Sequence, residues 1–257
     1  MWYQIYQYIK FIFKSKNQHG VHSPFIYNLV TTCFYDRSYF DDYIKLLHFR
    51  KTLIHNKTKI KVTDLGVGSQ VMSKQIRQIS DMARNAGTTK KRVQLLYRIT
   101  HYFKPKYILE LGTSLGIATH AMSLGYPESK ITTIEGCPNI SSFTKKNFKK
   151  HHLSDIKLLT GNFDEVIKTI PSSTFDLIFF DGNHQKKATL NYFEQLLKTA
   201  HNDSVFIFDD IYWSKDMTAA WETIKQHPKV TITVDTFFWG FVFFRKEQVK
   251  EHFIIRV

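Results

Sequence analysis

Short apolar segments alternate with helix-compatible segments through the second half of the chain. This alternation predicts a parallel sheet with helices on both faces, because parallel strands need crossover connections. The end of the chain differs, since residues 230–244 read as two apolar strands around a short Trp239-Gly240 turn, which indicates an antiparallel hairpin. The expected fold is therefore a doubly wound, mostly parallel α/β sheet of seven strands. The five apolar segments that precede the hairpin are 107–111, 130–135, 155–159, 174–180 and 203–208.

The first half of the chain reads as helical. We expect residues 1–103 to form an N-terminal extension that supplies substrate-capping or oligomer contacts, and residues 104–257 to form the main domain. Residues 1–14 have apolar side chains at helical spacing, which favours a helix packed on its own domain. A homodimer contact or a membrane-surface helix is the alternative. The loop with His19 and His22 has no cysteine or acid nearby and is given no role.

No stretch of the sequence reads as a transmembrane span or a signal peptide. The two cysteines, Cys33 and Cys137, provide no disulfide framework. These features predict a cytoplasmic protein.

A glycine turn follows the first strand of the alternating region. Glu110 lies near the end of this strand, and Gly112 and Gly116 bracket the turn before helix-compatible residues resume. Such a turn lets a ligand approach the backbone closely and is expected to leave N–H groups free at the helix N-terminus. A look-alike at residues 60–69 has no strand ending in an acid about 20 residues on, which leaves only a loop near a site as its possible role.

Polar residues end each of the later strands. Glu135 ends the second strand, 19 residues after Gly116, where a carboxylate can accept two hydrogen bonds from a ribose diol. Asn162 and Phe163 follow the third strand, and their amide and ring suit the edge and face of adenine. Asp181 ends the fourth strand, and Asp209-Asp210 ends the fifth. In open α/β sheets, ligands bind at these carboxyl ends.

The segments ELGTSLG, IEG, GNF, FFDGNH and FDDIYW resemble the class I S-adenosylmethionine-dependent methyltransferases over about residues 80–257. They are most similar to the catechol and caffeoyl-CoA O-methyltransferases and the cephalosporin-hydroxylase-like group. The resemblance implies a Rossmann-like fold, S-adenosylmethionine as methyl donor and O-methylation of a small molecule. Ser114 stands where a dinucleotide-binding turn needs its middle glycine, which disfavours a pyrophosphate ligand. Thr88-Thr89 corresponds to a segment that closes over the cofactor in this family.

The resemblance also assigns the residues that hold the methyl donor. It implies that Glu110 and the turn hold the methionine portion, Glu135 the ribose, and Asn162 with Phe163 the adenine. The donor-binding set is Glu110, Gly112, Thr113, Ser114, Gly116, Glu135, Asn162, Phe163 and Asp181.

The acids after the fourth and fifth strands suggest a mechanism. In the metal-dependent relatives an Asp and an Asp-Asn pair hold Mg²⁺, so the resemblance implies a metal set of Asp181, Asp209 and Asp210, with Asp210 in place of the Asn. Mg²⁺ or a similar cation would lower the pKa of a substrate hydroxyl. Alternatively, the acids cap the following segment and no metal binds. Asp181 and His184 are the catalytic candidates, although His184 could equally stabilise the next helix.

The net charge of +14 favours anionic partners and leaves other functions open. One alternative is an RNA-directed methyltransferase or RNA-binding protein on the same fold, motivated by the basic clusters Lys90-Lys91-Arg92, Lys145-Lys146 and Lys149-Lys150. Another is a non-catalytic scaffold. The tetrapeptide Asp181-Gly182-Asn183-His184 lacks the pair of prolines with which amino-directed nucleic-acid methyltransferases grip a base, which argues against that class.

Overall fold

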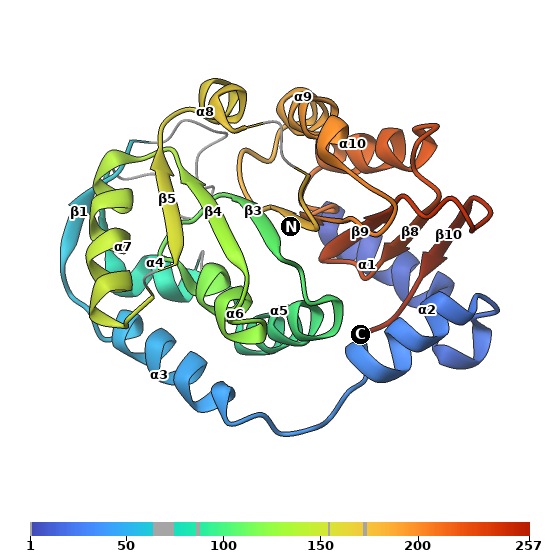
Figure 1. Cartoon of the computed structure of the whole chain (residues 1–257), viewed down its shortest axis with the longest axis horizontal. Helices are drawn as coiled ribbons and strands as arrows, with labels where there is room; N and C mark the ends of the chain where they lie inside the picture. Colours follow the sequence, from blue (N-terminus) through green and yellow to red (C-terminus); the bar gives the residue numbers. More distant parts are fainter. Residues whose placement is uncertain (1, 64–74, 86–87, 154, 172–173) are drawn as a thin grey trace. The chain divides into compact units, whose positions relative to one another are not determined.

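The computed structural model describes residues 2–63, 75–85, 88–153, 155–171 and 174–257. The chain divides into two compact units (Figure 1). The first unit combines Met1–Tyr35 with Ile170–Val257, and the second is Asp36–Thr169. The functional division expected at residue 103 remains a prediction.

The second unit contains three parallel strands that alternate with helices. Strands β3 (Tyr107–Leu111), β4 (Lys130–Glu135) and β5 (Ile156–Thr160) pair in this order. Short strands β1 (Lys59–Lys61) and β2 (Ile76–Gln78) form a separate antiparallel pair. The helices are α3 (Asp42–Ile54), α4 (Ile79–Asn85), α5 (Lys90–Phe103), α6 (Ile117–Gly125), α7 (Pro138–Lys150) and α8 (Phe163–Thr169).

The first unit contains five strands in the order β10-β8-β9-β7-β6. They are β6 (Leu177–Phe180), β7 (Val205–Asp209), β8 (Ile232–Asp235), β9 (Trp239–Phe243) and β10 (Glu251–Ile254). All side chains of β6 and β7 are buried, which explains why these strands read as continuous apolar runs. The helical segments are α1 (Trp2–Lys14), η1 (Gln18–Gly20), α2 (Pro24–Leu29), η2 (Val30–Phe34), α9 (Lys186–Leu196), η3 (Leu197–Thr199) and α10 (Lys215–Gln226).

The expected fold class is confirmed as a mostly parallel α/β arrangement with helices between the strands. Over both units these strands number eight, one more than the seven expected. The additional strand is β10, which pairs in parallel with β8. Its sequence, EHFI, begins with two exposed polar residues and therefore gives no apolar run that would mark a strand.

The final antiparallel hairpin is confirmed, but its turn was wrongly placed. Trp239 and Gly240 lie inside β9, and the turn is formed by residues 236–238. Phe237 adopts a positive φ of 72°, and its N–H donates to the Asp235 side chain. A glycine is needed at position 240 for a different reason, because a Cβ there would lie 2.7 Å from the Trp221 ring.

Helix α1 packs on its own unit, as the first interpretation expected, but through the unexpected face. The Tyr3 hydroxyl donates to Thr218 Oγ1 at 2.7 Å, and the Gln4 amide donates to the Trp213 carbonyl at 3.1 Å. Phe11 is buried. The apolar side chains that predicted the helix are exposed instead: Trp2, Ile5, Tyr6, Ile9 and Phe13.

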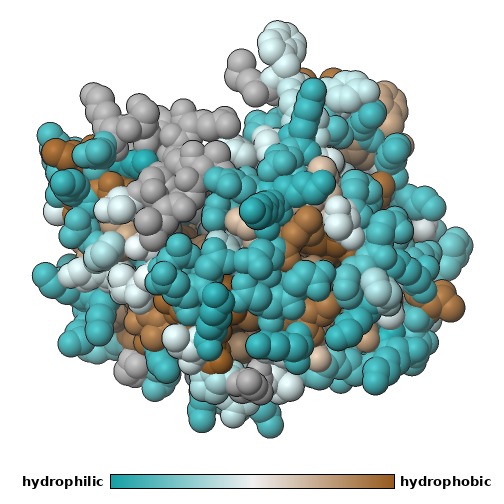
Figure 2. Space-filling view, turned by 90° about the horizontal axis from the view of Figure 1, so that it is seen from above, coloured by the Kyte–Doolittle hydropathy of each residue, from teal (hydrophilic) through white to brown (hydrophobic). Residues whose placement is uncertain are grey.

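The surface shown in Figure 2 is dominated by hydrophilic side chains, with apolar ones in smaller areas between them. In the second unit, the basic clusters at 90–92, 145–146 and 149–150 lie on helices α5 and α7, mostly as exposed side chains. Exposed lysines on helices are the usual solvated face of a domain. Within the described residues, no helix has the length and apolar character to cross a membrane.

Candidate functional site

The glycine turn joins β3 to α6 through three residues in the left-handed region. Gly112 has a φ of 107°, Ser114 of 47° and Gly116 of 77°. The backbone donors are satisfied internally: the N–H groups of Gly112 and Thr113 donate to the Ile134 carbonyl, and that of Gly116 donates to the Thr113 carbonyl. The turn therefore offers fewer free N–H groups than its sequence implied, which suits a ligand without phosphates.

Gly116 is required by the packing of α7 as well as by its backbone conformation. A Cβ at this position would lie 2.3 Å from Phe148 Cε1. We expect Gly116→Ala to lower the free energy of unfolding by about 2–4 kcal/mol, from left-handed strain and overpacking together. Urea denaturation measures this loss. Gly20→Ala is the matched control, because its Cβ would contact only the flexible Lys16 side chain. Equal losses in the two variants would contradict this account.

Glu135 ties the glycine turn to the end of β4. Its Oε2 accepts the Ser114 N–H and its Oε1 accepts the Cys137 N–H, both at 2.8 Å. Its backbone carbonyl accepts the N–H of Gly161, at the end of β5. The side chain is mostly buried. A single carboxylate thus holds together the carboxyl ends of β3 and β4, where the sequence expected a ribose ligand.

Glu110 lies fully buried beneath the turn, in a network of threonines that the sequence analysis missed. Its Oε2 accepts the hydroxyls of Thr119 at 2.6 Å and Thr133 at 2.5 Å, and Thr133 also hydrogen bonds with Thr113. Its Oε1 is buried without a hydrogen-bond partner. Burial raises the pKa of Glu110 to about 7, although the two threonine hydroxyls act in the opposite direction. Three isolated threonines give no pattern that links them to an acid.

Asn162 and Phe163 begin α8 directly after β5. The Asn162 side chain accepts the Asp164 N–H at 2.9 Å, and its backbone carbonyl accepts those of Glu165 and Val166. Asn162 therefore caps the helix, an arrangement typical of Asn at this position. Asn162 is exposed and Phe163 is half-buried. Their contact with an adenine ring remains a prediction.

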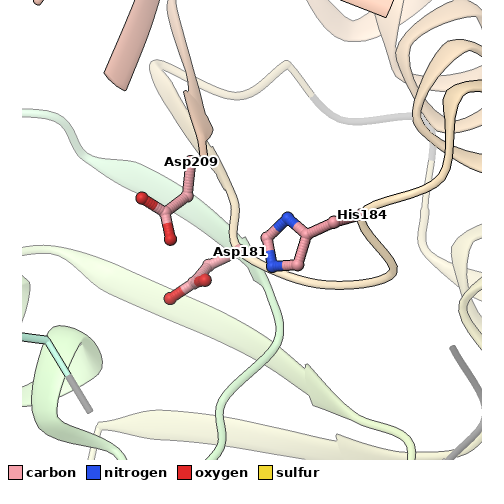
Figure 3. A group of neighbouring side chains, drawn as sticks. All are labelled: Asp181, His184 and Asp209. Carbon is pink, nitrogen blue, oxygen red and sulfur yellow. The ribbon is translucent and has the colours of Figure 1, made fainter. Parts of the chain in front are cut away.

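In the first unit, Asp181, His184 and Asp209 form a cluster (Figure 3). One ligand atom of each residue lies within 4.8 Å of the others. Asp181 and His184 belong to the loop after β6, and Asp209 ends the neighbouring strand β7. Burial lowers the pKa of His184, and the Asp209 carboxylate opposes this shift. The cluster combines two carboxylates with an imidazole that burial keeps neutral.

Asp210 is not one of the three residues of this cluster, and its role as a metal ligand stays a prediction from the sequence. It has a positive φ of 54° in the turn after β7. Asp209 is oriented by Trp239, whose Nε1–H donates to its Oδ1 at 2.7 Å. The antiparallel pairing of β7 with β9 places these two residues opposite each other. This partner was missed because the sequence placed Trp239 in a turn.

Two further sequence predictions concern Thr88-Thr89 and the loop at 60–69. Thr89 caps α5 by accepting the Arg92 N–H at 3.4 Å, as expected for a helix entry. Its closure over a cofactor is a prediction. The glycines of the look-alike loop at 60–69 lie outside the described residues. Met217 and Trp221 are buried on α10, so they belong to the core.

A separate cavity of about 600 Å³ lies in the second unit, beside the amino-terminal ends of β4 and β5. His48, His120 and His151 are among its lining residues. Phe49 packs between His120 and His151, with ring centroids 4.5 and 4.8 Å away. Burial, together with the charges of His151 and Lys45, lowers the pKa of His120 to about 4, while Asp42 acts in the opposite direction. This cavity lies at the amino-terminal ends of the strands, whereas Glu135 lies at the carboxyl end of β4.

The His120 pKa predicts a loss of stability in acid. The unfolded chain takes up a proton near the ordinary value of about 6.5 and the folded chain only near 4, so stability is lost as the pH falls between them. Between about pH 7 and pH 4.5 we expect this residue to account for about 2 kcal/mol. Urea denaturation gives the free energy of unfolding of wild type and His120→Gln at both pH values. The difference between the two proteins in their pH dependence is the contribution of His120, because the contributions of other groups, including Glu110, are common to both. The exposed His55→Gln should retain the wild-type pH dependence. Parallel curves for wild type and His120→Gln would refute the assignment.

Part of the chain is similar to known proteins. Residues 109–211 match the family described as "Methyltransferase domain". The O-methyltransferase hkm8 of Aspergillus hancockii is 28% identical over 127 residues, which cover 47% of this chain and 50% of the relative. The chain thus matches only about half the length of this curated relative.

Solved structures show the same fold. The S-adenosylhomocysteine-bound methyltransferase PaMTH1 of Podospora anserina superposes with a TM-score of 0.58 at 16% identity, covering 88% of this chain and 97% of that one. The O-methyltransferase of Bacillus cereus, in complex with S-adenosylhomocysteine, gives 0.52 at 18% identity, covering 82% and 93%. Residues 109–211 are therefore similar to a methyltransferase domain, and the chain shares the fold of these solved methyltransferases.

Proposed function

We propose that this protein transfers the methyl group of S-adenosylmethionine to an oxygen of a small-molecule acceptor. The observation that carries the proposal is the Glu135 carboxylate, which joins the glycine turn after β3 to the end of β4. The similarity to a methyltransferase domain and the S-adenosylhomocysteine-bound structures with the same fold support the choice of donor.

The donor would be held by the second unit. Glu135 would accept hydrogen bonds from a ribose diol, since a carboxylate offers about four acceptor sites. The unpartnered Glu110 Oε1 would be satisfied by a cationic ligand, and S-adenosylmethionine carries an ammonium and a sulfonium. A cation beside Glu110 would also lower its raised pKa and favour the carboxylate form. Asn162 and Phe163 would contact the adenine.

Methyl transfer would use the cluster of the first unit. The acceptor hydroxyl gives up its proton, its oxygen attacks the methyl carbon, and the carbon–sulfur bond breaks to leave neutral S-adenosylhomocysteine. Asp181 and His184 would receive that proton, since the lowered pKa of His184 favours its neutral form. The Trp239 N–H donates to Asp209 and would hold its negatively charged carboxylate in place within the cluster.

The same cluster fits a divalent cation. Three converging ligand atoms, one of them from a neutral imidazole, suit such an ion. The mixed oxygen and nitrogen donors suit Mn²⁺ as well as Mg²⁺. When bound, a cation would lower the pKa of the acceptor hydroxyl. Asp181 and Asp209 are the proposed carboxylate ligands, with His184 as the nitrogen ligand and Asp210 as a further candidate from the sequence.

Calorimetric titration tests the donor directly. We expect S-adenosylmethionine and S-adenosylhomocysteine to bind and NAD⁺ not to bind. No heat with either sulfur ligand would overturn the proposal and favour the scaffold alternative. A panel of phenols, catechols and hydroxy acids, followed by S-adenosylhomocysteine release, would then identify the acceptor.

Titration with Mn²⁺, followed by electron paramagnetic resonance, tests the cation independently of turnover. We expect binding that is lost in Asp209→Asn. If EDTA leaves turnover unchanged on an identified acceptor, the cation is not required and the Asp181–His184 route remains.

A further inference from the structure

Helix α1 exposes a stripe of apolar side chains and packs on its unit through Tyr3, Gln4 and Phe11. Trp2 and Phe13 are 82% and 86% exposed, which is high for aromatic side chains in a folded protein. Residues two, five, six, nine and thirteen follow the spacing of one helical face. The exposed stripe therefore runs along the whole helix. Its members are Trp2, Ile5, Tyr6, Ile9 and Phe13.

The orientation of α1 is fixed by polar contacts within the first unit. Tyr3 and Gln4 hydrogen bond to Thr218 and the Trp213 carbonyl, on and beside α10. Phe11 packs against Phe237, with ring centroids 5.6 Å apart. In Figure 1, α1 is the blue helix beside the red strands of this unit. Rotating the stripe inward would break these hydrogen bonds, so the exposed stripe is part of the folded state.

The charges on α1 and directly after it in the sequence have one sign. Lys10 and Lys14 are exposed on α1, and Lys16 follows it directly. No Asp or Glu precedes Asp36 in the sequence. An apolar stripe with Trp, Tyr and Phe, bordered by lysines, is the pattern of helices that lie in the interface of an anionic membrane. Aromatic rings prefer this interface, and lysine stems reach from it toward the headgroups.

We propose that α1 docks the protein on the surface of a membrane containing anionic lipid, with the stripe of residues two to thirteen inserted among the headgroups. At 13 residues, α1 is shorter than the roughly 20 that a helix needs to span a bilayer, so it would lie in the plane of the interface. Residues 1–35 contain lysines but no acid, so an anionic lipid surface is complementary to them in charge.

A second copy of the chain fits the stripe less well. The helix is about 20 Å long and 10 Å wide, so its face covers about 200 Å². A stable interface buries about 800 Å² per partner. A two-fold contact through this face would also bring the lysines of both copies together without an acid from residues 1–35.

Vesicle sedimentation with the full chain tests the proposal. We expect binding to phosphatidylcholine vesicles in which about a third of the lipid is phosphatidylglycerol, and much weaker binding to phosphatidylcholine alone. Phe13→Glu should weaken binding at least tenfold. Val249→Glu is the matched control, because Val249 is 80% exposed but lies outside α1, and it should bind like the wild type. The same charge is added in both variants.

A spectroscopic measurement separates insertion from non-specific attraction by the +14 charge. The tryptophan emission of the wild type should shift to the blue on vesicles, and Trp2→Phe should lose this shift. Binding that is equal in Phe13→Glu and wild type, or absent from anionic vesicles, overturns the proposal. A lipid-free dimer that Phe13→Glu dissociates, without vesicle binding, would also overturn it and assign the stripe to a second copy.

Discussion

Glu135→Gln is expected to weaken the binding of S-adenosylhomocysteine by at least about 100-fold, equivalent to about 2.7 kcal/mol. The two carboxylate oxygens accept different backbone N–H groups, from Ser114 and Cys137. Glutamine has only one carbonyl oxygen, so in either orientation its NH₂ faces one of these donors. An unsatisfied donor costs about 1–3 kcal/mol, and the proposed ribose contact weakens as well. Calorimetric titration with S-adenosylhomocysteine measures the change.

Glu128→Gln serves as the control for this prediction, because Glu128 is an exposed acid of the same unit, outside the glycine turn. Its affinity for the ligand should match the wild type. Thermal unfolding distinguishes a lost contact from a collapsed turn, since Glu135→Gln should remain folded. Wild-type affinity in a folded Glu135→Gln would remove Glu135 from the donor site.

The fold could be predicted from the sequence because its signals are local. Strand β3 and the buried run at 177–180 are mostly apolar, and glycine marks the turn at 112–116. Strand β10 was not predicted, because it begins with two exposed polar residues and is specified by its pairing with β8. The turn of the final hairpin was misplaced because Gly240 looks like a turn residue, whereas the ring of Trp221 is what excludes a side chain there.

The candidate site was predictable where residues follow strands directly, and less so where partners come from elsewhere. Glu135 and Asp209 end their strands as expected, and Asp181 directly follows β6. Spacing along the chain cannot show that Trp239 holds Asp209, since that contact depends on the register of β7 and β9. The exposure of Phe13 was equally hidden, because periodicity reveals that a helix has an apolar face but not which way that face turns.

Asp181→Asn is expected to lower the rate of methyl transfer at least about 100-fold on an acceptor identified by the panel, by removing either a general base or a cation ligand. Asparagine keeps the shape of the side chain, but it cannot take up the hydroxyl proton and neutralises one of the two carboxylates of the cluster. The affinity for S-adenosylhomocysteine should fall by less than about tenfold, because Glu135 and the glycine turn are intact. Single-turnover kinetics, with calorimetry on the same preparation, measures both quantities.

Two further variants decide which role Asp181 has. If it is a cation ligand, Asp181→Asn and Asp209→Asn should both lose Mn²⁺ binding, and their effects on the rate should not add, since each removes the same ion. If it is a general base, Mn²⁺ should have no effect on the wild type, and His184→Gln should slow the reaction alongside Asp181→Asn. Asp203→Asn, at an exposed acid paired with Arg245, is the control and should keep the wild-type rate. Full activity in Asp181→Asn would exclude both roles and move the search for the acceptor site away from the end of β6.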